Sequence, residues 1–181
     1  IPLAIKQLAN VSQIWVVSVD NEVKEVLFAL TRKDTTDLTI SAILISKASL
    51  KKYAYSYAAK PASLAFEMPQ QYLYEPNVAI LKAGLQDRVG ADFQLAKLHP
   101  NSHLYTSIQK QVAYPGRVFK VESVLTTNKK QLRKEIPAGQ ANITVRNFPL
   151  NVSAIRKKTG LKEGGEVYLF ATTLKDGKKV L

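Results

Sequence analysis

Nine basic side chains near the C-terminus are the strongest candidates for a binding role in this sequence. They fall in two runs, at 129–134 and 156–162, with one arginine between the runs. Lysine and arginine contact the phosphates of polyanions, and clustered positive charge raises the local concentration of such a polymer. The candidate nucleic-acid-binding residues are Lys129, Lys130, Arg133, Lys134, Arg146, Arg156, Lys157, Lys158 and Lys162.

The positive charge is distributed unevenly along the chain. The 181 residues have a formal net charge of +12, of which residues 1–75 contribute +1 and residues 76–181 contribute +11. A nearly neutral part joined to a strongly basic part indicates two units with different roles. A second interpretation stays open, in which the lysines are ordinary solvated faces, because basic residues near a helix C-terminus also interact favourably with the helix dipole.

Residue types that form catalytic or metal sites make no convincing constellation. His99 and His103 have helical spacing, but Pro100 between them breaks the helix that would present both on one face. Asp20 and Glu22 follow an apolar run, and a helix cap explains them more simply than a pair of functional acids. No glycine-rich phosphate or dinucleotide motif is present. We therefore expect no catalytic, cofactor-binding or metal-binding residue in this chain.

The amino-acid composition limits the cellular locations and the kinds of site that are expected for the protein. The chain contains no cysteine, which excludes disulfides and thiolate metal sites and agrees with a cytoplasmic location. The hydrophobic content of 46% suffices for a packed core. No apolar run is long enough to span a bilayer, and the N-terminus lacks the pattern of a signal peptide. We therefore expect no membrane partner.

The basic runs belong to a region in which strand and helix signals alternate. Helix caps are expected at Thr127 or Asn128 and at Asn151 or Ser153, and Asp176-Gly177 is a strong hairpin signal. Tyr168 and Phe170 fall on one face of a strand, where a core role and a base-stacking role are both open. The expected order is strand 118–127, helix 128–136, strand 142–148, helix 152–159, and strands 167–174 and 178–181.

The first half of the chain has fewer clear signals. Residues 1–8 resemble the end of a helix, and the continuous apolar run 14–19 predicts a strand buried on both faces. Asp20-Asn21 would cap a helix over residues 22–30, in which Val23, Val26, Leu27 and Leu30 recur at helical spacing. This makes residues 14–31 a β–α unit. A second strand is expected at 38–46.

The middle of the chain alternates between further short elements. Tyr53, Tyr55 and Tyr57 alternate with small residues, which fits either a strand edge or an aromatic loop. Residues 60–74 are expected to be a connector. Pro76 then opens a helix, and residues 85–93 predict a second one after Gly84.

The start of the chain suggests that it is part of a longer polypeptide. The first residue is Ile1 rather than methionine, and the strand expected at 14–19 needs neighbours that the first half scarcely supplies. We favour a fragment over the alternative, a mature N-terminus formed by removal of methionine.

Several stretches resemble a known family. Residues 71–84, QYLYEPNVAILKAG, resemble a segment that follows the catalytic domain in a group of bacterial class I S-adenosylmethionine-dependent methyltransferases. Residues 147–158, NFPLNVSAIRKK, and 164–173, GGEVYLFATT, resemble the C-terminal THUMP-like domain of those enzymes. Residues 15–25, WVVSVDNEVKE, are similar to the last β–α region of their methyltransferase domain.

The resemblance implies a parent methyltransferase, with RNA as the expected substrate because THUMP domains accompany RNA-modifying enzymes. In that family the glycine-rich cofactor-binding turn and the Asn/Asp-Pro-Pro-aromatic catalytic motif lie upstream of the stretches matched here. S-adenosylmethionine would therefore be the cofactor of the parent enzyme, and this chain alone should neither bind it nor turn over substrate. The implied partners are RNA and the upstream methyltransferase domain of the same polypeptide.

The expected fold class is α+β, with a small mixed αβ N-terminal unit followed by a ferredoxin-like or THUMP-like C-terminal domain. The expected organisation is a methyltransferase tail at 1–37, a connecting αβ region at 38–115 for which a ferredoxin-like arrangement is one interpretation, and a THUMP-like domain at 116–181. Two functions compete: an RNA-binding accessory region of a methyltransferase, and a structural or dimerisation module without nucleic-acid binding.

Overall fold

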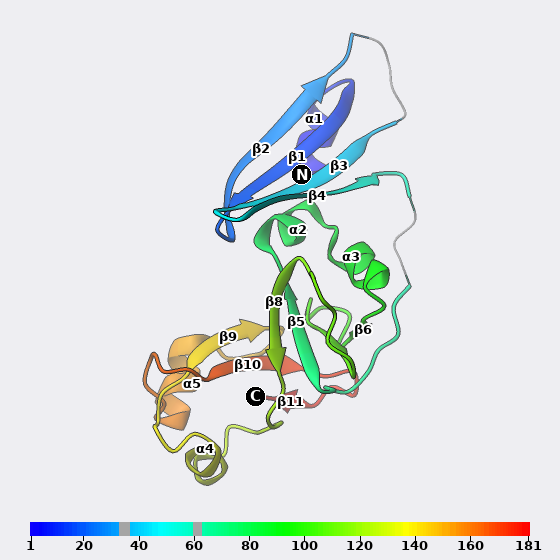
Figure 1. Ribbon diagram of the computed structural model, residues 1–181. Coiled ribbons are helices and arrows are strands. Elements are labelled where there is room, and N and C mark those ends of the chain that lie inside the picture. The colour runs from blue at the N-terminus through cyan, green and yellow to red at the C-terminus, as the bar shows by residue number, and fades with distance from the viewer. Residues whose placement is uncertain (33–36, 60–62) are drawn as a thin grey trace. The chain divides into compact units, whose positions relative to one another are not determined.

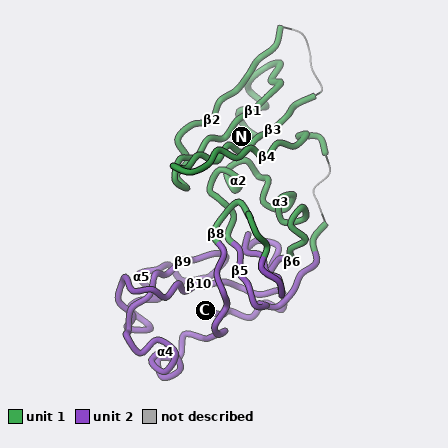
Figure 2. The backbone as a smooth tube through the Cα atoms, in the orientation of Figure 1, with its two compact units in different colours: residues 1–64, 75–95, 111–117 green, residues 65–74, 96–110, 118–181 purple. Residues whose placement is uncertain are grey.

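The computed structural model (Figure 1) describes residues 1–32, 37–59 and 63–181. These residues form helices and strands in several sheets, which confirms the α+β class. Figure 2 divides the chain into two units whose segments interleave. Unit 1 comprises Ile1–Leu64, Glu75–Leu95 and Gln111–Arg117, and unit 2 comprises Ala65–Tyr74, Ala96–Lys110 and Val118–Leu181. Among the described residues, no helix has the length and apolar character needed to cross a membrane.

Unit 1 contains a four-stranded sheet that follows a short helix, α1 (Pro2–Gln7). Its strand order is β2-β1-β3-β4, and β1 pairs antiparallel with β2 and parallel with β3. The strand expected at 14–19 is therefore confirmed, with both neighbours inside the described part of the chain. Its expected burial on both faces is wrong, because Ile14, Val16 and Ser18 are fully buried whereas the other face of the strand is only partly buried. The strands are β1 (Val11–Val19), β2 (Glu22–Leu30), β3 (Thr39–Ser46) and β4 (Ser49–Ser56).

The helix expected over residues 22–30 is wrong, because this segment is strand β2. Asp20 and Asn21 have φ angles of 47° and 63°, a two-residue turn of the kind that asparagine and aspartate tolerate between antiparallel strands. They make a hairpin turn rather than a helix cap. The β–α arrangement that the resemblance implied for residues 15–25 is corrected in the same way. The unit 1 sheet therefore contains strands from both sides of residue 37, the position at which the sequence predicted the methyltransferase tail to end.

Two short helices follow β5 (Tyr72–Pro76): α2 (Val78–Ala83) and α3 (Gln86–Asp92). Both expected helices form, but Pro76 ends the strand instead of opening a helix, because α2 begins at Val78 after its cap Asn77. The amide oxygen of Asn77 accepts hydrogen bonds from the backbone N–H of Ala79 and the hydroxyl of Ser18, both at 2.9 Å. The side chain of Asn21 accepts from the N–H of Val78 at 3.1 Å. The hairpin turn between β1 and β2 thus supplies a second cap that fixes the first turn of α2.

Of the alternating tyrosines, Tyr53 and Tyr55 belong to β4, which lies at the edge of the unit 1 sheet, and Tyr57 lies in the turn after it. The hydroxyl of Tyr55 donates a hydrogen bond to the carboxylate of Asp92 on α3. Arg88 lies 5.8 Å from the centre of the Tyr55 ring and donates to the carbonyl oxygen of Ser56 at 2.6 Å. Burial, followed by the hydrogen bond to Asp92, raises the pKa of Tyr55 above its ordinary value of 10.0.

Tyr55 should make the stability of the protein sensitive to alkaline pH. Because the folded state holds the Tyr55 proton more tightly than the unfolded state, its contribution is complete below about pH 10 and falls as pH rises above that value. The free energy of unfolding of the wild type should drop between pH 9 and pH 11, and that of Tyr55→Phe should drop less. Urea titrations at the two pH values measure both, and equal drops would contradict the assignment.

Unit 2 contains a three-stranded sheet of order β11-β10-β9, made of β9 (Asn142–Arg146), β10 (Tyr168–Thr173) and β11 (Lys179–Val180). β9 and β10 are parallel, and β10 and β11 are antiparallel around Asp176-Gly177, which confirms the expected hairpin. Asn128 caps α4 (Lys129–Glu135) and Asn151 caps α5 (Val152–Thr159), so the expected helices form at their predicted caps. Gly160, with a φ of 81°, ends α5.

A further four-stranded sheet has the order β6-β7-β5-β8, with β6 (Ala96–Lys97), β7 (Tyr105–Ser107) and β8 (Gly116–Lys120). The strand expected at 118–127 is shorter than predicted: β8 begins at Gly116 and ends at Lys120. Arg117 binds the carboxylate of Glu75 through two nitrogens, at 2.8 and 2.5 Å, and a Cβ at Gly116 would clash with the Glu75 carbonyl. Of the expected connector at 60–74, residues 60–62 lie outside the described residues, and residues 63–71 form no helix or strand beyond one bridge at Phe66. Residues 72–74 belong to strand β5, so this part of the expected connector is wrong.

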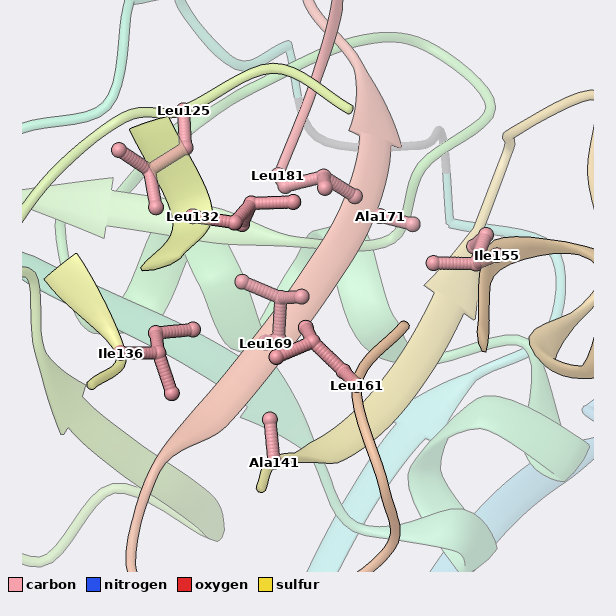
Figure 3. Close-up of a cluster of buried hydrophobic side chains, with 9 residues drawn as sticks. All are labelled: Leu125, Leu132, Ile136, Ala141, Ile155, Leu161, Leu169, Ala171 and Leu181. Atoms are coloured by element: carbon pink, nitrogen blue, oxygen red, sulfur yellow. The ribbon is translucent and has the colours of Figure 1, made fainter. Parts of the chain in front are cut away.

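The two faces of β10 contact different clusters of apolar side chains. Leu169 and Ala171 point towards α4 and α5, where they meet Leu132, Ile136 and Ile155 (Figure 3). Phe170 and Leu174 belong instead to a cluster with Leu73, Leu98, Leu104 and Val180. Because side chains alternate along a strand, the sheet has one face covered by the helices and another packed on the rest of unit 2.

Candidate nucleic-acid interface

Helix α4 presents four of the predicted basic residues to solvent. Leu132 and Ile136 are buried in the core, so the intervening positions face outwards. The side-chain oxygen of Asn128 accepts from the N–H groups of Lys130 at 2.9 Å and Gln131 at 3.3 Å, which fixes where the helix begins. The basic residues exposed on α4 are Lys129, Lys130, Arg133 and Lys134.

Helix α5 and the loop after it add three exposed lysines. Ile155 and Thr159 are buried, and Lys157 and Lys158 between them are exposed. Lys162 is exposed in the loop, where its backbone exchanges hydrogen bonds with Gly139 at 2.9 Å and Ala141 at 3.0 Å. These bonds place Lys162 beside the segment that follows α4.

A small pocket of about 170 Å³ lies where the segment before α4 meets α5 and β11. Its lining includes the ammonium-bearing side chains of Lys158 and Lys179 and the hydroxyl-bearing Thr126 and Thr127. Lysine and threonine side chains are both common donors to phosphate oxygens. The pocket lining therefore combines lysine and threonine residues from three elements that are separated in the sequence, and the Thr126 hydroxyl already donates to the side-chain oxygen of Gln131 at 3.2 Å.

Lys179 is an exposed member of this set that sequence reasoning missed. Its register opposite Thr173 places it on the same side of β11 as the helices. The signal that could have found it is the alternation of Lys179 and Val180 directly after the Asp176-Gly177 turn.

Arg146 and Arg156 are placed differently from the seven exposed residues. Arg146 follows Val145, which packs on the helix side of β9, and lies opposite Thr172, so it belongs to the other sheet face. Arg156 is half-buried on α5, and its guanidinium donates to the carbonyl oxygen of Ala141 at 3.4 Å. The structure thus brings seven of the nine predicted residues to the helix-covered side.

We name as the basic face these seven residues together with Lys179. None of the eight side chains forms an ion pair within the described parts of the chain. Their charges are therefore uncompensated at short range and add to a positive potential outside the helices. The basic face consists of Lys129, Lys130, Arg133, Lys134, Lys157, Lys158, Lys162 and Lys179.

The aromatic side chains of β10 do not form part of the basic face. The Phe170 ring is 8% exposed and lies 4.9 Å from Phe119, and the Tyr168 ring lies 5.0 Å from Phe119. All three lie on the side of the sheet away from α4 and α5. The basic face therefore offers contacts to phosphates without a stacking platform for bases, and such contacts position a polymer without reading its sequence.

The histidines lie in loops, where Nδ1 of His99 is 3.0 Å from the side-chain nitrogen of Asn147. Across residues 1–32, 37–59 and 63–181, no group of three or more residues could hold a metal ion.

Comparisons with known proteins agree with the C-terminal architecture. Residues 116–181 match the model of a THUMP domain-like family, and residues 72–115 match that of a ferredoxin-like domain. The chain is similar to the crystal structure of a "putative methyltransferase" from Porphyromonas gingivalis W83, with a TM-score of 0.87 and 36% sequence identity. The similarity covers 98% of this chain and 46% of that one, so the chain spans about half the length of that relative. No curated protein gives a significant match.

Proposed function

We propose that this chain is the RNA-binding accessory region of an S-adenosylmethionine-dependent methyltransferase and that the cofactor site lies outside it. The THUMP-like match to residues 116–181 and the similarity to a methyltransferase of about twice the length support this proposal. The observation that carries it is the basic face, because its eight cations lie inside the THUMP-like region and have no ion-pair partners there.

RNA binding would proceed through phosphates. Exposed lysines on α4, α5 and β11 can follow a flexible single strand, and the pocket at Lys158 and Lys179 can hold one phosphate group with hydroxyl donors beside it. Such binding releases counterions, so it weakens as salt is added. The accessory region would hold the RNA while a separate domain performs methyl transfer.

The cofactor part of the proposal rests on the sequence. S-adenosylmethionine sites of class I enzymes use a glycine-rich turn between a strand and a helix, and no such turn precedes a helix in the part of the chain that the structure describes. The catalytic role would therefore belong to the upstream methyltransferase domain of the parent polypeptide.

One pair of titrations tests this proposal. Fluorescence anisotropy with a labelled single-stranded RNA should show binding whose log K falls linearly with log salt, by roughly 0.7 per phosphate contact. Calorimetric titration with S-adenosylmethionine should show no heat of binding. RNA affinity equal to that of an unrelated protein of the same net charge would favour the structural or dimerisation module instead, and a micromolar cofactor site would contradict the assignment of the catalytic domain.

A further inference from the structure

A second and larger pocket of unit 2 is lined by none of the basic-face residues and by more acidic than basic side chains. Its volume is about 350 Å³, within the range of small-molecule sites. It opens between β10 and residues 119–125, which comprise the end of β8 and the segment after it, and its walls are mostly apolar. The proposed RNA-binding role does not use this pocket.

Aromatic rings form one wall of the pocket. Phe119 contacts Tyr168 and Phe170 with ring centres 5.0 and 4.9 Å apart, and all three residues line the pocket. Tyr168 is 45% exposed as a residue, so part of its side chain remains in contact with solvent. Aromatic faces carry negative potential and attract cations, particularly cations whose bodies are themselves apolar.

Carboxylates gather at the same pocket although the surrounding region is strongly basic. Residues 116–181 contain five acidic residues, and three of them, Glu122, Glu135 and Glu166, line this pocket. Lys120 pairs with Glu122 at 3.5 Å. Glu135 and Glu166 have no ion-pair partner in the described chain, despite the abundance of lysine nearby. Two negative charges therefore remain uncompensated at the edge of an aromatic wall.

Helix α4 contributes residues both to the basic face and to the lining of the larger pocket. Its four basic residues lie on the basic face, whereas Glu135, the acidic residue of the helix, joins Ile136 in lining the pocket. Thr172, which is 3% exposed, adds a hydroxyl oxygen to the wall, and this oxygen can accept a hydrogen bond from an ammonium group. The combination of apolar walls, an aromatic face and unpaired carboxylates is complementary to one class of ligand.

We propose that this pocket binds a small organic cation, an ammonium group carried on an apolar or aromatic body. The body would lie against Phe119 and Tyr168, and the ammonium would face Glu135 and Glu166. An anionic ligand of the same shape would be repelled by both carboxylates, and a neutral one would gain only the apolar contacts.

Three probes that share one body test the proposal: 3-phenylpropylammonium, 3-phenylpropanol and 3-phenylpropionate. We expect their affinities for the full chain to decrease in the order cation, alcohol, anion. The affinities are measured by titration, with the amide chemical shifts around Glu166 and Tyr168 as the signal. The cation should bind roughly tenfold more tightly than the alcohol, the combined effect of one aromatic face and two partly screened carboxylates. Equal affinity for cation and alcohol, or no binding of the cation, would overturn the proposal.

Variants separate the charges from the pocket shape. The double change Glu135→Gln and Glu166→Gln should reduce cation affinity about fivefold and leave alcohol affinity unchanged, because glutamine keeps the shape and removes the charge. Glu163→Gln is the matched control, since Glu163 is exposed in the same region but does not line the pocket. A loss of affinity that is the same for both probes, or the same in the Glu163 variant, would contradict the proposed role of the carboxylates.

Discussion

Replacement of Ile155 by alanine should lower the free energy of unfolding by roughly 2–5 kcal/mol, the range for large-to-small changes at buried aliphatic positions. Ile155 is fully buried and connects α5 to the cluster that holds Leu132 of α4 and Leu169 of β10 (Figure 3). The change would remove apolar contacts and leave a cavity beneath the helix. Urea denaturation followed by circular dichroism measures the loss.

Lys157→Ala is the control for this experiment, because Lys157 lies on the same helix and is exposed. Its effect should stay within about 0.5 kcal/mol, as for most surface changes. Hydrogen exchange should also show faster exchange of the β9 and β10 amides in the Ile155 variant. A variant no less stable than the Lys157 control would mean that the cluster does not hold α5 on the sheet.

The C-terminal elements could be predicted because their signals are local. Asn128 and Asn151 each cap a helix with their own side chain, and Gly160 and Gly177 take the positive φ angles that end a helix and turn a hairpin. Each signal depends on a few neighbouring residues and on backbone chemistry alone. Tertiary structure did not have to be known in order to find them.

Strand β2 could not be predicted in the same way. Its sequence EVKEVLFAL places apolar residues at helical spacing and also allows a strand, so periodicity does not decide between them. The pairing of Val16 with Val26 and of Trp15 with Leu27 along β1 decides it. Short apolar segments take the structure that their neighbours in space require.

The sequence indicated a basic candidate site, but it identified only some of the residues that the structure places there. Counting charges along the sequence was enough to find the basic helices, because lysine side chains are mostly exposed in folded proteins. It could not show that Arg146 lies on the other face of the sheet, which depends on the register of β9 with β10. Nor could it show that Lys158 and Lys179 line one pocket and Glu135 and Glu166 another, since these pockets are formed only by the fold.

The basic side chains of α4 should account for a large part of RNA affinity. At about 0.1 M salt each phosphate contact to a single strand contributes roughly a factor of five, so loss of four contacts should weaken binding by roughly 100- to 1000-fold. The slope of log K against log salt should become shallower by about 3. The variant for this test combines Lys129→Glu, Lys130→Glu, Arg133→Glu and Lys134→Glu.

A charge-matched control distinguishes a local interface from general attraction by a cationic protein. The control reverses four exposed lysines of unit 1, so both variants have the same net charge. If RNA binds the basic face, the α4 variant should lose affinity for every RNA sequence alike, whereas the control should lose much less. Equal losses in the two variants would show that only net charge matters and would favour the structural module. The control combines Lys6→Glu, Lys47→Glu, Lys52→Glu and Lys82→Glu.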